Sequence, residues 1–306
     1  MVNKYTFYEM ALTWIQNKET YVKITTSNAY HLIIHNHLNP EFGEQEEITE
    51  SDLQKFILMK LGTGLSQKTV KDIIVVFNMI MRYAFKQGMH ERVLYEVLYP
   101  VNQKKSSLSV LPKESMKKVF YYIENNFTFN NLGIFICLST GIRIGEVCAL
   151  KWSDVNLENG TLSIQRTIQR TYNKNDTIKT KIIIDTPKAI NSNREVPLSN
   201  KLIKLLKSLK KIVNNDYYII SNHINPIEPR TYRIYFIKLL DELEIQHIKF
   251  HALRHTFATR CIESGADYKT ISVILGHSNI STTLNLYVHP NHEQKKKCIE
   301  KMLKSI

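Results

Sequence analysis

Six side chains suited to phosphoryl chemistry are spread over residues 143–287. They are Arg143, Lys188, His251, Arg254, His277 and Tyr287. A phosphodiester resists a nucleophile because its two free oxygens are negative, and two arginine forks can neutralise both at any working pH. A phenol, with an ordinary pKa of about 10, must lose its proton as it attacks. The set predicts transfer of a phosphodiester to Tyr287, with His251 as the base, Lys188 as the acid and His277 as a further hydrogen-bond donor.

Each residue also has an ordinary structural interpretation. Arg143 could form a salt bridge with Glu146, and His251 and His255 could cap a helix. Lys188 could be a solvated hairpin residue, His277 a turn residue, and Tyr287 a core residue. Each signal alone is weak, and only the occurrence of all six in this order is specific.

The composition points to a polyanionic partner. The chain has 306 residues, typical of one large or two ordinary domains, with 41 Lys and Arg against 28 Asp and Glu. Its net charge is +13 and its isoelectric point is about 9.4, which favours DNA, RNA or an anionic membrane surface. No apolar run is long enough to span a membrane, and the N-terminus lacks the pattern of a signal peptide.

The four cysteines form no CxxC pair and are expected to be free thiols, which fits a reducing cytoplasm. Acidic residues form no cluster suited to Mg²⁺, which disfavours a two-metal nuclease. The new tyrosyl linkage would store the energy of the broken bond, so ATP is not needed. We therefore expect no metal and no cofactor.

Charge divides the chain near residue 99. Residues 1–98 carry 10 basic and 11 acidic residues, whereas residues 99–306 carry 31 and 17. The sequence YPVNQKKSS at the boundary is typical of a linker. We expect a helical domain at 1–98, a linker at 99–110, and a second domain at 111–306 that ends in a tail helix.

The first part predicts four helices in a compact bundle, at residues 5–17, 27–38, 49–60 and 66–88. The second helix should stop before Pro40, and Thr49 with Asp52 should form a capping box at the start of the third. Lys68, Lys71 and Arg82 are candidate phosphate contacts, with ordinary solvated surface residues as the alternative.

The second part predicts helices around a small sheet. Helical periodicity covers residues 112–125, 131–139, 144–150, 201–213, 229–243, 251–264, 268–275 and 281–287. The segments LSIQRTIQR, TIKTKIII and REVPL, separated by turn residues, predict one antiparallel sheet with hairpins. The fold class is therefore mainly α with a small antiparallel sheet. The tail is expected to form an amphipathic helix, and its apolar stripe contains Cys298, Ile299, Met302 and Leu303.

The motifs TGIRIGE, TPKAINSNREVPL, HALRHT, LGHSN and LNLYVH, in this order, resemble the tyrosine recombinase (phage integrase) family. The resemblance covers residues 110–290 strongly. It assigns the six residues above to catalysis and Glu146 to support of the first arginine. The bundle before them resembles the family's core-binding domain. The long hairpin region at 165–181 resembles the integrases of phages and conjugative transposons more than the chromosome-dimer resolvases.

The resemblance implies a site-specific recombinase in the cytoplasm, associated with the nucleoid. Two domains would clamp duplex DNA, four protomers would assemble on two sites, and each Tyr287 would form a 3′-phosphotyrosyl bond and release a 5′-hydroxyl. Strands would exchange through a Holliday junction. The tail would dock on a neighbouring protomer, with packing on its own domain as the alternative. This sequence begins directly with the bundle, so the resemblance does not extend to the arm-binding domain that many such integrases carry.

Two other functions are compatible with parts of the pattern. A type IB topoisomerase-like enzyme would nick, swivel and reseal DNA as a monomer. A non-catalytic DNA-binding regulator could keep the fold, but it would not need Tyr287 or Lys188.

Overall fold

The computed structural model describes residues 5–91, 95–101, 109–172, 180–185, 193–277 and 279–284, with five residues of the tail: 296, 299, 300, 302 and 303. The chain forms two compact units. The first contains Met1–Ser106 with Thr171–Lys181, and the second contains Ser107–Arg170 with Ile182–Ile306. Each unit has its own hydrophobic core.

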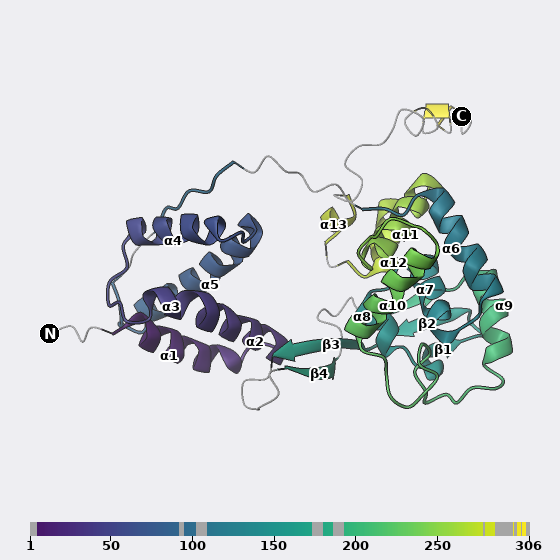
Figure 1. Cartoon of the computed structure of the whole chain (residues 1–306), viewed down its shortest axis with the longest axis horizontal. Helices are drawn as coiled ribbons and strands as arrows, with labels where there is room; N and C mark the ends of the chain where they lie inside the picture. Colours follow the sequence, from purple (N-terminus) through teal and green to yellow (C-terminus); the bar gives the residue numbers. More distant parts are fainter. Residues whose placement is uncertain are drawn as a thin grey trace. The chain divides into compact units, whose positions relative to one another are not determined.

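Helices build the first unit (Figure 1). They are α1 (Phe7–Glu19), α2 (Ile24–Ile33), a π-helical turn η1 (Ile34–Leu38), α3 (Asn39–Phe42), α4 (Glu50–Gly62) and α5 (Gln67–Lys86). The predicted capping box at Thr49 is confirmed, since Thr49 and Asp52 exchange hydrogen bonds at the start of α4. Thr6 and Glu9 form the same arrangement at α1.

The prediction that a helix over residues 27–38 stops before Pro40 is wrong. The helical path begins at Ile24, widens into η1 and continues through α3, whose first turn contains Pro40. A proline in the first turn of a helix needs no N–H donor. The wide π turn ahead of it restarts the hydrogen-bond pattern, so the chain can pass Pro40 without ending the helix.

Aromatic rings form the centre of the first unit. Phe7 stacks on Phe77 with ring centroids 5.5 Å apart, and Phe42 lies 5.0 Å from Phe56 and 5.6 Å from Phe77. All four are essentially buried. The apolar stripe of α5 is therefore covered by α1, α3 and α4, which is the bundle that the periodicity predicted.

The second unit places helices around a small sheet (Figure 1). Its helices are α6 (Lys113–Asn125), α7 (Phe129–Thr140), α8 (Ile144–Ala149), α9 (Asn200–Leu209), α10 (Pro229–Glu242), α11 (Ala252–Glu263), α12 (Tyr268–Leu275) and α13 (Ser281–Leu284), with a 3-10 turn η2 (Trp152–Asp154). Nine residues of α7 are buried, so this helix runs through the core. The fold class is confirmed.

Among the described residues the strands form two sheets rather than the single sheet predicted. Strands β1 (Val155–Asn156), β2 (Thr161–Ile164) and β5 (Arg194–Pro197) form one antiparallel sheet, and β3 (Thr167–Tyr172) pairs with β4 (Thr180–Asp185). Strand β5 pairs with β2, with Leu162 opposite Val196, and both side chains are buried. Burial of this apolar pair explains why REVPL joins β2 instead of extending the hairpin.

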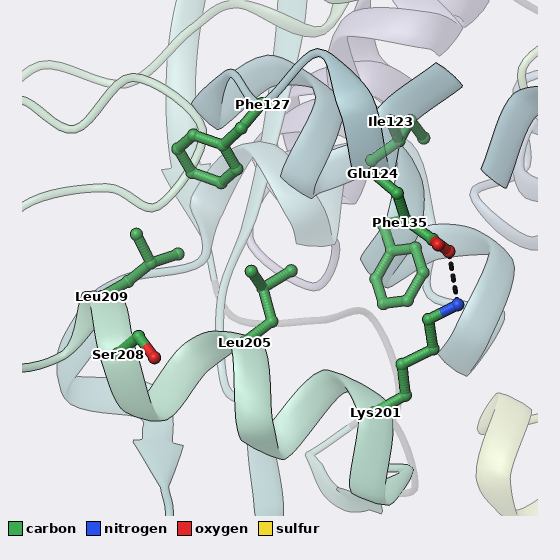
Figure 2. Close-up of a pocket in the computed structure, with 8 residues that line it drawn as sticks. All are labelled: Ile123, Glu124, Phe127, Phe135, Lys201, Leu205, Ser208 and Leu209. Carbon is green, nitrogen blue, oxygen red and sulfur yellow. Dashed lines mark hydrogen bonds and ion pairs between the residues drawn. The ribbon is translucent and has the colours of Figure 1, made fainter. Parts of the chain in front are cut away.

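A pocket of about 320 Å³ lies where α9 packs beside α6 and α7 (Figure 2). Its walls are mostly apolar, with Phe127, Phe135 and Leu205 turned into it, and the ion pair between Lys201 and Glu124 lies at one side. The four candidate catalytic residues that the structure describes, Arg143, His251, Arg254 and His277, do not line it.

In the part of the chain that the structure describes, no helix has the length and apolar character needed to cross a membrane. Cys137 and Cys148 are buried free thiols and Cys261 is a partly buried one, as predicted; Cys298 lies outside the described residues.

Candidate active site

The C-terminus of α12 is where three arginines meet. The helix ends at Gly276, whose φ of 66° turns the chain away. Three consecutive backbone carbonyls there each accept a hydrogen bond from a different guanidinium. The pairs are Arg194 Nε to Ile274 O at 2.7 Å, Arg254 Nη2 to Leu275 O at 2.7 Å and Arg143 Nη2 to Gly276 O at 3.4 Å. We call these acceptors the α12 carbonyl cluster. The last carbonyls of a helix lack intrahelical partners and form the negative end of its dipole, so they suit cations.

Arg254 on α11 is almost fully buried, with 2% of its surface exposed. Besides Leu275 O, its Nη1 donates to Gly141 O at 2.9 Å. Gly141 has φ of 68°, and a Cβ there would lie 2.5 Å from the Phe257 ring. The second residue of the TGIRIGE motif must therefore be glycine. Burial and the nearby Arg143 lower the pKa of Arg254 to about 9, which leaves it charged at neutral pH.

Arg143 stands at the N-cap of α8 and is tied to Glu146 one turn later. Its Nη1 lies 2.9 Å from Glu146 Oε1, and its backbone N–H donates to Glu146 Oε2 at 2.8 Å. Glu146 is 3% exposed, whereas Arg143 is 36% exposed. The salt bridge that the sequence offered as an alternative therefore exists, and it leaves part of the arginine fork open to a ligand.

His251 precedes α11 at its N-cap position and is exposed on one side. Its ring meets the His255 ring edge-on, with centroids 4.6 Å apart. Partial burial, His255, Arg254 and Arg143 together lower the pKa of His251 to about 4. The ring is therefore neutral near pH 7 and can accept a proton.

His277 follows the α12 carbonyl cluster directly. Its Nδ1 pairs with the Thr283 hydroxyl at 2.7 Å, which leaves Nε2 as the nitrogen that a phosphate oxygen could meet. Burial, Arg254 and Arg143 lower the pKa of His277 to about 4. Beside it lies an open pocket of about 580 Å³ whose lining includes Arg194 and Gly276.

The structure therefore brings together Arg143, Glu146, His251, Arg254 and His277 from α8, α11 and the end of α12. Lys188 and Tyr287 lie outside the described residues, as do most of the linker and of the tail. Within the described residues, no three His, Cys, Asp or Glu side chains gather in a group that could hold a metal ion.

Sequence reasoning missed Arg194, which belongs to the same cluster. Its guanidinium contacts both oxygens of Glu146, at 3.2 and 3.0 Å. A signal was present in the strand pattern, because side chains two residues apart share a face and Arg194 lies on the side of the buried Val196. An arginine on the core face of a strand needs an acidic or carbonyl partner.

The lowered histidine pKa values predict loss of stability on acidification. The pKa values of His251 and His277 fall from 6.5 to about 4 in the folded protein, and that of His255 is also lowered. Between pH 6.5 and pH 4 the unfolded chain binds protons that the folded protein does not, so acidification favours unfolding. The thermal unfolding midpoint should fall steadily from pH 7 to pH 4.5, and less steeply in His277→Gln. An equal fall in both proteins would contradict this origin.

Comparison with known proteins gives the family of the chain. The model of the phage integrase family matches residues 109–294, and that of the phage integrase N-terminal SAM-like domain matches residues 6–61. The chain is 29% identical over 287 residues to a tyrosine recombinase XerC-like protein of Caldanaerobacter subterraneus subsp. tengcongensis. The aligned region spans 85% of this chain and 72% of the relative.

Two solved structures share the fold. The Tn1549 transposon integrase in complex with transposon right end DNA gives a TM-score of 0.79 at 21% identity, covering 98% of this chain and 100% of that chain. A lambda integrase tetramer bound to a Holliday junction gives a TM-score of 0.66 at 19% identity, covering 93% of this chain and 78% of that chain. Because the first family model covers more than half of the sequence, the chain belongs to the phage integrase family and is a tyrosine recombinase, an enzyme of site-specific DNA recombination.

Proposed function

We propose that this recombinase cleaves and rejoins DNA one strand at a time through a 3′-phosphotyrosyl bond to Tyr287, without metal or ATP. The observation that carries the proposal is the convergence of Arg143, Arg254 and His277 at the end of α12. In the sequence, Tyr287 follows His277 by ten residues.

Arg143 and Arg254 would act on the scissile phosphate itself. Negative charge grows on the two non-bridging oxygens as the phosphorus becomes five-coordinate, and fixed donors aimed at such charge are usually the largest catalytic contribution. The α12 carbonyl cluster holds both guanidinium groups before DNA arrives, so little reorganisation is needed. His277 would add one hydrogen bond to the same phosphate.

Proton transfer completes the step. The Tyr287 oxygen forms a bond to phosphorus while the bond from phosphorus to the 5′ oxygen of the next nucleotide breaks. The phenol proton passes to His251, which is neutral at working pH, and the departing oxygen takes a proton from Lys188. The phosphotyrosyl bond keeps the energy of the phosphodiester, so attack by a 5′-hydroxyl from a second strand reverses the step and exchanges the strands.

A nicked suicide substrate tests this assignment. Cleavage close to the nick releases a short oligonucleotide, which prevents religation and traps the protein on DNA. We expect a covalent adduct in the presence of EDTA, with the DNA 3′ end attached to the peptide that contains Tyr287. An adduct on another residue, or one that forms only with a divalent metal, would overturn the mechanism. DNA from the genomic flanks of the gene is the natural first substrate.

We further propose that four protomers act on two DNA sites through a Holliday junction. Support comes from the lambda integrase tetramer, which is bound to such a junction, and from the tail, where Ile299, Met302 and Leu303 are 51–62% exposed and could bind a neighbouring protomer. Such an enzyme would work on the chromosome, in the nucleoid. Light scattering of the DNA complex tests this: a strictly monomeric complex would favour a swivelling enzyme instead.

The 1–98 domain is proposed to bind the DNA duplex beside the cleavage site, with residues 99–110 as linker and 111–306 as catalytic domain. Lys68, Lys71 and Arg82 are exposed on α5, and their spacing of three and eleven residues places them along one helix face. Lys71 Nζ lies 4.8 Å from the Tyr99 ring centroid, which holds it by a cation–π contact.

Salt dependence measures these contacts. Each phosphate neutralised by a cation releases condensed counterions and contributes about 0.9 to the slope of log K against log salt. The triple variant K68A/K71A/R82A should reduce that slope by about 3. The matched control K204A/K207A/K211A removes the same charge from exposed positions on and just after α9. Equal slopes for the two variants would show that only total charge matters.

A further inference from the structure

Arg194 on β5 is nearly as buried as Arg254, with 6% of its side chain exposed. Its Nη1 and Nη2 contact the two oxygens of Glu146 at 3.2 and 3.0 Å, and its Nε donates to Ile274 O at 2.7 Å. Each of the three guanidinium nitrogens therefore donates to the protein.

The partners of Arg194 are the residues that orient the proposed catalytic groups. Glu146 also binds Arg143, at 2.9 Å through Nη1 and 2.8 Å through the backbone N–H. Ile274 is the first acceptor of the α12 carbonyl cluster, three residues before His277. One side chain thus joins the N-terminus of α8 to the C-terminus of α12, the two segments that carry Arg143 and His277.

Arg194 and Arg143 share the carboxylate of Glu146. Glu146 has two oxygens, and a carboxylate paired with a single arginine tends to form a bidentate fork. Because Arg194 occupies both oxygens, Arg143 keeps only one guanidinium contact with Glu146. Without Arg194, Glu146 could draw both amino groups of Arg143 toward itself and away from a phosphate. The buried carboxylate would also lose a cation that stabilises its charge.

We propose that Arg194 is a positioning residue for strand cleavage: through Glu146 and Ile274 it holds Arg143 and His277 in the geometry that meets the scissile phosphate. This inference rests on the proposed function of the same site. Misplacement by about 1 Å can cost about 100-fold in rate, so a large loss is expected from the positioning role alone.

The test is single-turnover cleavage of the nicked substrate at saturating protein. Arg194→Met should reduce the cleavage rate by about 100-fold and change the DNA Kd by less than about threefold. Arg194→Lys keeps the charge but cannot make the three contacts, so it should remain at least about tenfold impaired. Wild-type rates in both variants would overturn the inference.

A double-mutant cycle separates positioning from general damage. If Arg194 acts through Glu146, Arg194→Met in a Glu146→Gln background should cost less than about threefold more than Glu146→Gln alone. Fully multiplicative effects would contradict the route through Glu146. If Arg194→Met does not fold, the same cycle is run with Arg194→Lys.

A pH profile gives a readout that simple destabilisation would not move. Burial alone would raise the pKa of Glu146, but Arg194 and Arg143 hold it below its ordinary value. The groups that face or act on this carboxylate are Arg143 at the start of α8, Arg194 on β5, Arg254 and His251 at α11, and Cys137 on α7. In Arg194→Met the acid limb of the cleavage rate should move to higher pH. An unmoved limb would count against the inference.

Arg166 supplies a matched control. It contacts Asp154, a buried carboxylate that caps the short turn η2 through the backbone N–H of Lys151, as Glu146 caps α8. Arg166→Met removes a comparable ion pair from the same unit and should leave the cleavage rate within about threefold.

If the wild-type chain itself forms no adduct, the proposed function fails and the inference fails with it. If the wild type cleaves and Arg194→Met cleaves equally, only the inference fails.

Discussion

Tyr287→Phe is expected to bind DNA with unchanged affinity and to form no covalent adduct. Phenylalanine keeps the ring and removes only the oxygen that forms the bond to phosphorus. Loss of the nucleophile of a covalent mechanism costs more than about 10⁴-fold in rate, so adduct on the nicked substrate should fall below detection. Binding is measured by electrophoretic shift at low salt, and the adduct by denaturing gel.

Tyr268→Phe is the control for this variant. Tyr268 is the first residue of α12 and is partly buried in the same unit, so its change tests whether loss of another phenol from this unit matters. Tyr268→Phe should cleave at the wild-type rate. Covalent product from Tyr287→Phe would show that another residue is the nucleophile, and would leave the role of the arginines to be tested independently.

Arg254→Lys should have the next largest effect. Arg254 donates to Gly141 O and Leu275 O from a position that is 2% exposed. A lysine ammonium cannot make both contacts and also present a planar fork to a phosphate. We expect cleavage to fall by about 10²–10³-fold, the range for removal of one preorganised donor of this kind, with DNA affinity reduced far less.

The same substitution should also affect folding. One of the two buried carbonyls would lose its partner, which costs about 1–3 kcal/mol, so thermal unfolding must be recorded with the kinetics. Arg260→Lys is the matched control on the same helix, because Arg260 also donates to a backbone carbonyl, Leu111 O at 2.7 Å, and pairs with Glu263 at 2.8 Å. Arg260→Lys should lose stability without losing cleavage. A similar loss of cleavage in both variants would mean that Arg254 acts only through stability.

Features that depend on near neighbours in the chain could be predicted from the sequence alone. The capping box of Thr49 with Asp52, the apolar stripe of α5 and the bounds of α12 each depend on residues within one or two turns, so their patterns are complete in the local sequence. Chemistry could be predicted as well, because few functions need two arginines, two histidines, a lysine and a tyrosine in this order. Family comparison confirmed that the chain is a tyrosine recombinase.

Long-range pairing was decided by the tertiary structure. Strand β5 pairs with β2 because burial of Leu162 against Val196 outweighs the hairpin that the sequence order suggests. Pro40 lies inside a continuous helical path because η1 restarts the hydrogen bonds, a local event that periodicity does not report.

The same holds for the site. From the sequence, Arg143 and Arg254 were two cations of similar kind, and Arg194 was one residue of a strand. In the folded protein Arg143 is 36% exposed beside Glu146, Arg254 is buried between two carbonyls, and Arg194 donates to Glu146 and to Ile274 O. Residue types and order determined which reaction is possible, since those are chemical properties of side chains. The burial of each arginine and its carbonyl partners, which lie up to 133 residues away along the chain, depend on the packing of α7, α8, α11, α12 and β5 together.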